Sequence, residues 1–216
     1  MKKESIKQAI EELRKPENKK KFAQSFDLII NLKDLNLKKP EEQVDFFTNL
    51  KYAPSKQKVA ALVGQELSDS AKVCDKIIKQ SEFDEYKNNP KKSKKLASEY
   101  DFFIAQADIM PKVAQAFGRV LGTRGKMPNP KLGTILPGKA PVEPIYKKLQ
   151  SAVKISAKKT PVIQVKIGRE DMKDEQIIEN ALTLYDQIVH NLPKERSNVK
   201  NVLIKLTMSK PIKIEI

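Results

Sequence analysis

Two kinds of apolar pattern occur in this chain, and their order along the sequence constrains the fold more than any other feature. The segments FDLIINLKDL, which starts at Phe26, and VLIKLTM, which ends at Met208, alternate apolar and polar residues. This alternation is typical of strands with one buried face, with Met208 on the apolar face. Between them, KVAALV at Lys58–Val63 is a continuous apolar run, typical of a parallel strand buried on both faces. The sequence therefore predicts that an α/β domain is inserted into an α+β domain built from both chain ends.

The predicted fold class is α+β with two domains. Pro54 and Ser55 mark a junction. We expect the outer domain, a split α+β sandwich, to comprise residues 1–57 and 152–216, and the inserted three-layer α/β domain to comprise residues 58–151. In the outer domain the pattern predicts an antiparallel sheet with helices on one side, including a long amphipathic helix with Asp174 as its N-cap.

The inserted domain is expected to alternate strands with helices. After the first strand, four apolar residues share one face of a predicted helix: Leu67, Ala71, Cys74 and Ile78. A second strand is predicted around Phe102–Ala105, and a second helix over Met110–Phe117.

The segment GRVLGTRGKMPNPKLGTILPGK, Gly118 to Lys139, contains five of the chain's seven glycines. No acidic residue occurs between Ile109 and Val142. We predict a loop whose glycine N–H groups approach phosphates, and the alternative is an exposed connector in which Gly and Pro only make turns. The cations of this region are Lys112, Arg119, Arg124, Lys126, Lys131 and Lys139, of which Arg119, Arg124, Lys126 and Lys131 are the candidate RNA contacts.

The overall charge points to a polyanionic partner. The chain carries 42 Lys and Arg against 27 Asp and Glu, a formal net charge of +15. Such an excess favours nucleic acid over a surface that is basic only for solubility. A single cysteine excludes an internal disulfide and favours a reducing cytosol. No apolar run is long enough to span a membrane, and the amphipathic N-terminal segment is not typical of a signal peptide.

Residues that would support catalysis are scarce. The only histidine, His190, is expected on the polar face of the last helix, and Cys74 is expected in the core. The segment GTRGKMPNPK lacks the Ser or Thr that follows the lysine of a phosphate-binding P-loop. A nucleotide- or phosphate-processing enzyme would have to use Asp101 and Asp108, the acids near a strand end. We therefore predict no catalytic site, no metal and no cofactor.

Two further segments are candidate RNA contacts. In KKKFAQS, Lys19–Ser25, three lysines precede Phe22, which could stack on a base or a ribose; the alternative is that Phe22 covers the core. In KLTMSKP, Lys205–Pro211, the hydroxyls of Thr207 and Ser209 could donate to 2′-hydroxyls or phosphates. The alternative there is an ordinary strand end.

Taken together, these segments resemble the family of the large-subunit ribosomal protein L-one, the protein of the mobile side stalk, in its archaeal type. The segments that carry the resemblance are FFIAQADIMPKVAQAFGRVLGTRGKMPNPKLGT, KKFAQSFDLIINLKDLNLKKPEEQ and KNVLIKLTMSKP. The similarity covers nearly the whole chain in the expected order. One departure is that the family usually has Thr-Met-Gly-Pro where this chain has Thr207-Met208-Ser209-Lys210-Pro211.

The resemblance implies a ribosome-associated protein, monomeric when free, whose outer domain binds large-subunit rRNA. It also implies transient contact with exit-site tRNA and, in prokaryotic members, repression through the protein's own mRNA. Carried over by position, the RNA contacts are Lys21, Phe22, Ser25 and Asp27 on one side and Asn201, Thr207, Met208 and Ser209 on the other. An RNA-processing factor of the same fold that works off the ribosome is the alternative.

Overall fold

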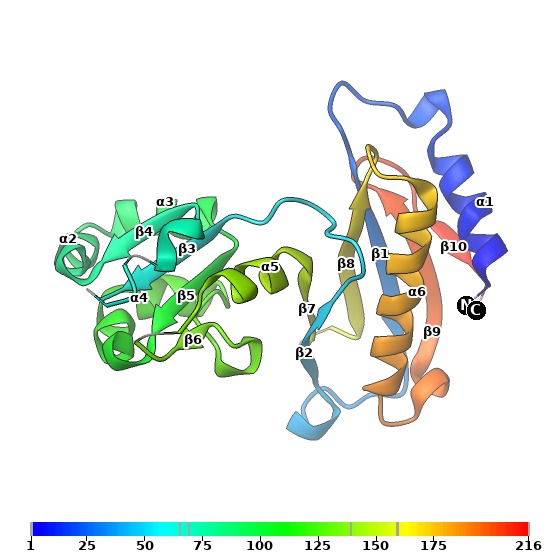
Figure 1. Ribbon diagram of the computed structural model, residues 1–216. Coiled ribbons are helices and arrows are strands. Elements are labelled where there is room, and N and C mark those ends of the chain that lie inside the picture. The colour runs from blue at the N-terminus through cyan, green and yellow to red at the C-terminus, as the bar shows by residue number, and fades with distance from the viewer. Residues whose placement is uncertain (1, 65, 69, 139, 159, 216) are drawn as a thin grey trace. The chain divides into compact units, whose positions relative to one another are not determined.

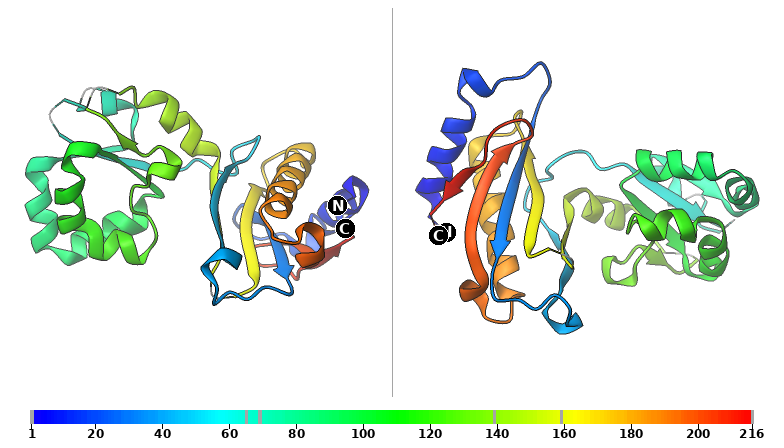
Figure 2. Two further views of the ribbon diagram at one scale, coloured as in Figure 1. Left: turned by 90° about the horizontal axis from the view of Figure 1, so that it is seen from below. Right: turned by 180° about the vertical axis from the view of Figure 1, so that it is seen from behind.

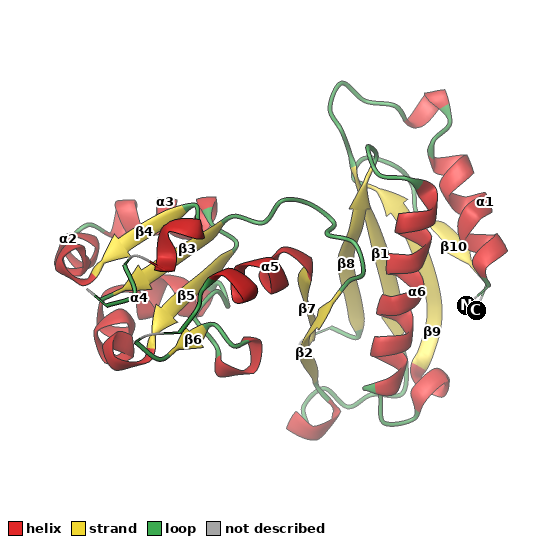
Figure 3. Cartoon of the chain, viewed as in Figure 1, coloured by secondary structure: helices red, strands yellow, loops and turns green. Residues whose placement is uncertain are grey.

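The computed structural model describes residues 2–64, 66–68, 70–138, 140–158 and 160–215. The chain divides into two compact units (Figures 1 and 3). The outer unit contains the residues up to 55 and those from 151 onward, and the inner unit contains residues 56–150. The first boundary lies two residues before the predicted one, and the second lies one residue before it. The mixture of helices and sheets is the α+β composition expected from the sequence.

The outer unit is built on a four-stranded antiparallel sheet. Its strands, in spatial order, are β10 (Ile212–Ile214), β9 (Val199–Leu206), β1 (Ser25–Leu32) and β8 (Val162–Arg169). A separate antiparallel pair joins β2 (Val44–Asn49) to β7 (Ala152–Ala157). Helices α1 (Lys3–Leu13) and α6 (Asp174–His190) cover one face of the large sheet, and no helix in the described part of the outer unit covers the other face (Figure 2, right).

Alternation along the strands explains why the sheet has one buried face. Every second residue of β1, from Phe26 to Leu32, is at most 4% exposed, and its neighbours on the strand are only half-buried. The buried residues pack against the apolar stripe of α1, which includes Ile6, Ile10 and Leu13. Each such side chain contributes about 1.5–3 kcal/mol by leaving water. The two chain ends meet in this unit, where the Lys2 N–H donates to the Glu215 carbonyl at 3.4 Å.

The inner unit is built on a parallel sheet. Its strands, in spatial order, are β4 (Lys76–Lys79), β3 (Val59–Val63), β5 (Phe102–Gln106) and β6 (Ile135–Leu136). One face is covered by α2 (Phe83–Asn88), α3 (Pro90–Glu99) and α4 (Met110–Thr123), and α5 (Glu143–Ser151) lies on the other (Figure 2, left). Every residue of β3 is buried, as its continuous apolar run predicts.

Short 3-10 turns connect these elements. They are η1 (Pro16–Asn18), η2 (Pro40–Glu42), η3 (Ser70–Val73), η4 (Gln80–Glu82), η5 (Ala107–Ile109), η6 (Pro130–Leu132) and η7 (Glu195–Asn198). Among the described residues, no helix combines the length and the apolar character that crossing a membrane requires.

The helix predicted through Leu67 and Ile78 is wrong. The spacing of apolar residues there does reflect burial, since both are at most 1% exposed. However, the segment ends in strand β4, which pairs in parallel with β3. The Asp75 carboxylate accepts the Val59 N–H at 2.9 Å and so holds the start of β4 on the sheet. Sheet pairing and the β-branched residues of β4 therefore outweigh the helical spacing.

The glycine-rich segment is not a loop throughout, as the sequence had suggested. Helix α4 continues to Thr123 and so includes Gly118 and Gly122. The apolar stripe of Val113, Phe117 and Leu121 is fully buried, and its burial exceeds the roughly 1 kcal/mol that each helical glycine costs.

The predicted role of the glycine N–H groups as a phosphate cradle is also wrong. The Gly125 N–H donates to the Gly122 carbonyl at 3.0 Å, and the Gly133 N–H donates to the Pro130 carbonyl at 2.9 Å. Both glycines have left-handed φ angles, 63° and 71°, which other residues rarely adopt. They therefore make turns, which was the alternative interpretation. Lys139 lies outside the described residues.

Cys74 provides a test of this packing. Burial, together with a smaller effect of the neighbouring Asp75 carboxylate, raises the pKa of its thiol to about 11. Because the thiolate is the reactive form, we expect Cys74 to react with a disulfide reagent at pH 8 at least about 100-fold more slowly in the native protein than in denaturant. Comparable rates in the two conditions, measured by release of the coloured thiol, would show that Cys74 is accessible and ionised.

Candidate nucleic-acid interface

The two segments predicted to contact RNA meet at one end of the outer sheet, where the central strand β1 begins and the central strand β9 ends. In the β1–β9 pairing, Phe26 lies opposite Leu206, so the residues before β1 lie beside those after β9. The Thr207 hydroxyl continues the pairing beyond the strands. Its oxygen accepts the Ser25 N–H at 3.1 Å and lies 3.4 Å from the Ser25 carbonyl oxygen. We call this region, residues 19–25 and 207–210, the β1–β9 edge.

Gln24 links three segments at this edge, and it is fully buried. Its amide oxygen accepts the Met208 N–H at 3.0 Å, and its amide nitrogen donates to the Asn18 carbonyl at 2.8 Å. The Glu170 carboxylate accepts the Gln24 N–H at 2.8 Å and lies 3.3 Å from the side-chain amide nitrogen. The sequence analysis missed both Gln24 and Glu170, because their partners are far away along the chain.

The turn after β9 differs from the prediction. The strand ends at Leu206, so Met208 is not on its apolar face but in the turn. The Ser209 N–H donates to the Leu206 carbonyl at 3.2 Å, and the Ser209 hydroxyl accepts the Leu206 N–H at 2.8 Å. Ser209 thus closes the turn with its own side chain. It has no left-handed φ, since Asp34 and Glu195 are the only such non-glycine residues described.

Two apolar side chains project into solvent at the β1–β9 edge. Phe22 is 53% exposed and Met208 is 64% exposed, and they are the two most exposed large apolar residues of the described chain. Both lie next to Gln24: Phe22 precedes it by two residues, and the Met208 N–H is bonded to it. An exposed ring and a flexible thioether at the same end of these strands suit packing against bases and riboses.

Lysines surround these apolar side chains. Lys19, Lys20, Lys21 and Lys210 are all exposed. A cavity of about 490 Å³ lies beside Phe22, and Lys15, the three consecutive lysines and Glu170 are among the residues that line it. The edge therefore combines apolar contact groups with a positive rim.

Arg14 holds the back of this cavity rigidly. Its guanidinium contacts the Asp174 carboxylate at 2.7 Å and donates to the Glu170 and Met172 carbonyls, each at 2.8 Å. The sequence predicted Asp174 as the N-cap of this helix, but Asp174 is the first residue of α6 and Lys173 is the N-cap. Its carboxylate pairs with Arg14 and does not cap the helix.

Asp27 and Asn201 lie on the uncovered face of the sheet and not in the turn region. Asp27 accepts a hydrogen bond from Gln164 at 3.1 Å, and Asn201 accepts one from Asn31 at 2.6 Å. Asn201 is five residues before Leu206, or about 17 Å along the strand. The structure therefore does not bring Asn201 together with Thr207, Met208 and Ser209.

The four predicted contacts of the inner unit have different environments. Arg119 lies on α4, and Arg124 follows its end; both are exposed, as is Lys131 in η6. Lys126 is turned inward, where its ammonium donates to the Tyr100 carbonyl at 2.7 Å and lies 4.0 Å from the Asp101 carboxylate. Burial lowers the pKa of Lys126, against the opposing effect of Asp101. Lys126 is therefore held within the unit.

The residues considered for enzyme chemistry are dispersed. Asp101 precedes β5 and Asp108 follows it, so the two carboxylates lie at opposite ends of that strand. His190 is exposed and Cys74 is buried. No group of three or more His, Cys, Asp or Glu residues suited to a metal ion occurs in the described part of the chain.

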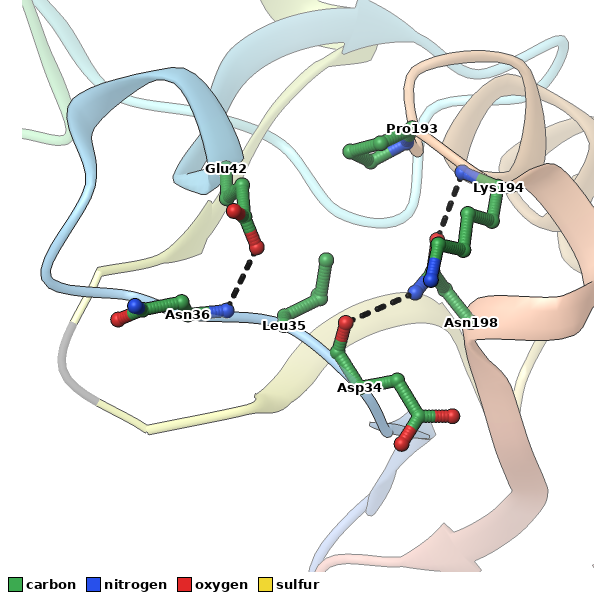
Figure 4. A pocket seen from close by; sticks show the side chains of 7 residues that line it. All are labelled: Asp34, Leu35, Asn36, Glu42, Pro193, Lys194 and Asn198. Carbon is green, nitrogen blue, oxygen red and sulfur yellow. Dashed lines mark hydrogen bonds between the residues drawn. The ribbon is translucent and has the colours of Figure 1, made fainter.

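A second cavity, of about 600 Å³, lies at the opposite end of β1 and β9 (Figure 4). Asn198 organises its wall by donating to the Asp34 carbonyl at 3.4 Å and accepting the Lys194 N–H at 2.8 Å. Asp34 and Glu42 contribute carboxylates to the lining, against a single lysine. This mixture does not favour an anionic ligand, so the β1–β9 edge is the candidate interface.

Comparison with known proteins identifies the family of the chain. The family model described as "Ribosomal protein L1p/L10e family" matches residues 11–210. The chain belongs to the ribosomal protein L1p/L10e family. This confirms the resemblance inferred from the sequence.

Several archaeal members of the L1p/L10e family are similar over their full length. "Large ribosomal subunit protein uL1" of Methanothermobacter thermautotrophicus is 40% identical, over 98% of this chain and 97% of that protein. The protein of the same name from Methanothermococcus thermolithotrophicus is 38% identical over 100% of both chains. That of Thermococcus kodakarensis is 36% identical over 96% and 95%. The β1–β9 edge lies inside the region that matches the L1p/L10e model.

Proposed function

We propose that this chain is a structural protein of the large ribosomal subunit, that it binds rRNA at the mobile side stalk, and that it is not an enzyme. The observation that carries the proposal is the β1–β9 edge, where Phe22 and Met208 stand exposed on a scaffold closed by the buried Gln24. Membership of the L1p/L10e family and the net charge of +15 support it.

The edge would recognise RNA by shape. Folded RNA presents bases and 2′-hydroxyls on a wide, shallow minor groove or in unpaired segments. Phe22 and Met208 would pack on these groups, and the Ser25 hydroxyl and the remaining lone pair of the Thr207 hydroxyl would bond to riboses. Because hydrogen bonds within the protein already hold the turn, little ordering would be needed on binding. Lys21 and its neighbours would add a salt-dependent attraction to phosphates.

The other carried-over residues would have secondary roles. Ser209 would position the turn and not contact RNA, because its hydroxyl is used by Leu206. Asp27 and Asn201 would contact only RNA that extends over the uncovered face of the sheet. The missing family glycine would therefore be replaced by a serine that closes the turn through its side chain.

The wider roles follow from the resemblance. The chain would be ribosome-associated in the cytoplasm, would assist release of exit-site tRNA by transient contact, and would repress translation by binding a similar structure in its own mRNA through the same edge. The two units would behave as separate domains. Co-sedimentation with large subunits from cell extract tests this against an RNA-processing factor that works off the ribosome, which would remain in the lighter fractions.

Removing the exposed apolar groups should reveal the site. We expect Phe22→Ala to raise the Kd for a large-subunit rRNA fragment by about 5- to 100-fold, since stacking of an aromatic ring on one base contributes about 1–3 kcal/mol. We expect Met208→Ala to raise it at least about five-fold, because the variant loses apolar contact with the RNA. Val162→Ala is the matched control: it trims an apolar residue of the same unit, 38% exposed, away from the edge. Its expected effect is less than about two-fold, the range of ordinary surface changes. Equal effects of all three variants in fluorescence titrations would place the RNA elsewhere.

A further inference from the structure

A groove on the helical face of the inner unit is lined by cations. It has a volume of about 590 Å³ and runs between α3 and α4, with the end of α2 at one side. Its charged lining residues are Lys87, Lys94, Arg119 and Arg124, and no carboxylate lines it. An adjoining cleft shares Lys87, Gln115 and Ala116 with it and adds Lys112, with Asp84 as its single acid. Positive charge therefore follows the groove along much of α4.

These cations are not neutralised by nearby acids. Across the described part of the chain, no carboxylate lies within 4.0 Å of the charged groups of Lys87, Lys94, Arg119 or Arg124, whereas the neighbouring Glu85 is paired with Lys92 outside the groove. All four groove cations are exposed. An anion could therefore bind these four cations without first breaking an ion pair within the protein.

One wall of the groove is preorganised. The Arg124 guanidinium donates to the Ser98 hydroxyl at 2.6 Å, and that hydroxyl donates to the Lys94 carbonyl at 2.9 Å. This chain of hydrogen bonds holds Arg124 against α3, beside Lys94. Arg119 lies five residues earlier, about 7.5 Å along the helix axis at 1.5 Å per residue. The groove therefore contains two guanidinium groups at different positions along its length.

Among the described residues that line it, the groove offers no exposed aromatic side chain, and its accessible apolar residues, Pro90, Ala116 and Val120, are small. Tyr86 and Ser93 are each 2% exposed, and the Tyr86 ring packs on Phe117 with 5.3 Å between ring centroids. A peptide ligand usually binds through large apolar or aromatic anchors in pockets, and the one aromatic ring of this lining, Tyr86, is buried. A strand of nucleic acid can bind through its phosphates alone, and arginine recognises phosphate by paired N–H groups.

We propose that the α3–α4 groove binds an RNA strand through its phosphates, without sequence preference, as a second RNA contact of this protein. It goes beyond the function proposed for the β1–β9 edge, because it is formed entirely within the inner unit. It retains Arg119 and Arg124 from the glycine-rich segment and adds Lys87 and Lys94, which come from two other helices. Lys126, which is held inward, and Lys131, which lies outside the lining, have no part in it.

Charge reversal in the full chain tests this proposal. The probe is a single-stranded uridine oligonucleotide of about twelve residues, within the usual site size of single-strand binding proteins. We expect Lys94→Glu with Arg119→Glu to raise its Kd at least ten-fold at low salt. The slope of log affinity against log salt should become less steep by about 1.4, the value for two lost contacts to a single strand. The neutral variant, Lys94→Gln with Arg119→Gln, should lose less oligonucleotide affinity, in the same direction. It tests the same two positions if the charge-reversed variant does not fold.

The matched control changes charge equally outside the groove. Lys95→Glu with Lys131→Glu also reverses two exposed cations of the inner unit, one of them on α3. We expect this variant to lose less than half as much, in log units, as the groove variant. Equal losses would show diffuse attraction and overturn the proposal. The proposal would also be overturned if the groove variant bound polyglutamate less tightly but bound the oligonucleotide as before. The occupant of the groove would then be an acidic peptide.

The outcome is independent of the outer unit. In a Met208→Ala background, the groove changes should cause the same fold loss of oligonucleotide affinity, because separate sites contribute additively. A groove effect that persists while Met208→Ala leaves rRNA binding unchanged would support the groove and contradict the β1–β9 edge. If the groove changes left oligonucleotide affinity unchanged while Met208→Ala still weakened rRNA binding, the result would contradict the groove and support the β1–β9 edge.

Discussion

Replacing Gln24 by methionine is expected to weaken binding of large-subunit rRNA at least about ten-fold and to lower the free energy of unfolding by about 2–4 kcal/mol. The side chain is fully buried and makes three hydrogen bonds, to the Asn18 carbonyl, the Glu170 carboxylate and the Met208 N–H. Methionine keeps the length and the apolar stem but can make none of these three hydrogen bonds, at a position that is itself fully buried. Each lost bond of this kind costs about 1 kcal/mol, and more where a charged group is involved.

The loss of affinity has a separate cause from the loss of stability. The Gln24 amide oxygen is the acceptor that fixes the Met208 backbone, two residues beyond the end of β9. Without it the turn would sample other conformations, and RNA would have to order it on binding. Such ordering costs about 1–2 kcal/mol per residue, which is the physical basis for the expected ten-fold effect.

Gln164→Met is the matched control, since it makes the same chemical change on the uncovered face of the sheet. Gln164 is exposed and donates to Asp27, so we expect a change of less than about 0.5 kcal/mol in unfolding free energy. Urea unfolding gives the stability, and titration of an rRNA fragment gives the affinity. If Gln24→Met destabilised the protein but bound rRNA as tightly as the parent, the β1–β9 edge would not be the binding surface.

Asn180→Leu should lower the free energy of unfolding by at least about 3 kcal/mol, because it leaves buried backbone groups without partners. Asn180 is fully buried in α6 and joins it to two other segments. Its amide nitrogen donates to the Tyr52 carbonyl at 2.9 Å and to the Ile167 carbonyl at 2.8 Å, and its oxygen accepts the Tyr52 N–H at 3.0 Å. A leucine has the same branching at Cγ but can replace none of these bonds.

The same substitution at Asn191 is the control for Asn180. Asn191 follows the last residue of α6, is exposed, and donates to the Gln187 carbonyl at 2.8 Å. Water can replace that bond, so we expect a change below about 1 kcal/mol. Urea titrations of both variants, followed by circular dichroism, measure the difference. Similar midpoints for the two variants would mean that the link from α6 to Tyr52 contributes little.

Much of the secondary structure could be predicted from local pattern. The alternation of Phe26, Leu28 and Ile30 determines which face of β1 is buried, because neighbouring side chains of a strand point to opposite sides. The continuous run of β3 identified a strand covered on both faces. Where the pattern misled, as at Ile78, the cause was a neighbouring strand that no local spacing reveals.

The candidate site was only partly visible in the sequence. Resemblance to the family pointed to Phe22, Thr207 and Met208, and the structure places all three at one edge. Gln24 and Glu170 gave no signal, since a buried glutamine and a carboxylate 146 positions apart become partners only when the strands pair. The same reason hid the α3–α4 groove: Lys94 and Arg119 belong to different helices, whose buried residues share one core cluster.

The sequence by itself thus determined the strands and helices of strong periodicity, the positive charge and the family, because these depend on the order of residue types along the chain. The tertiary structure alone decided which polar groups are buried against one another, which glycines make turns, and which cations remain free to meet an anion. Those properties depend on distances between segments that are remote in sequence. Only the packing of the apolar faces sets those distances.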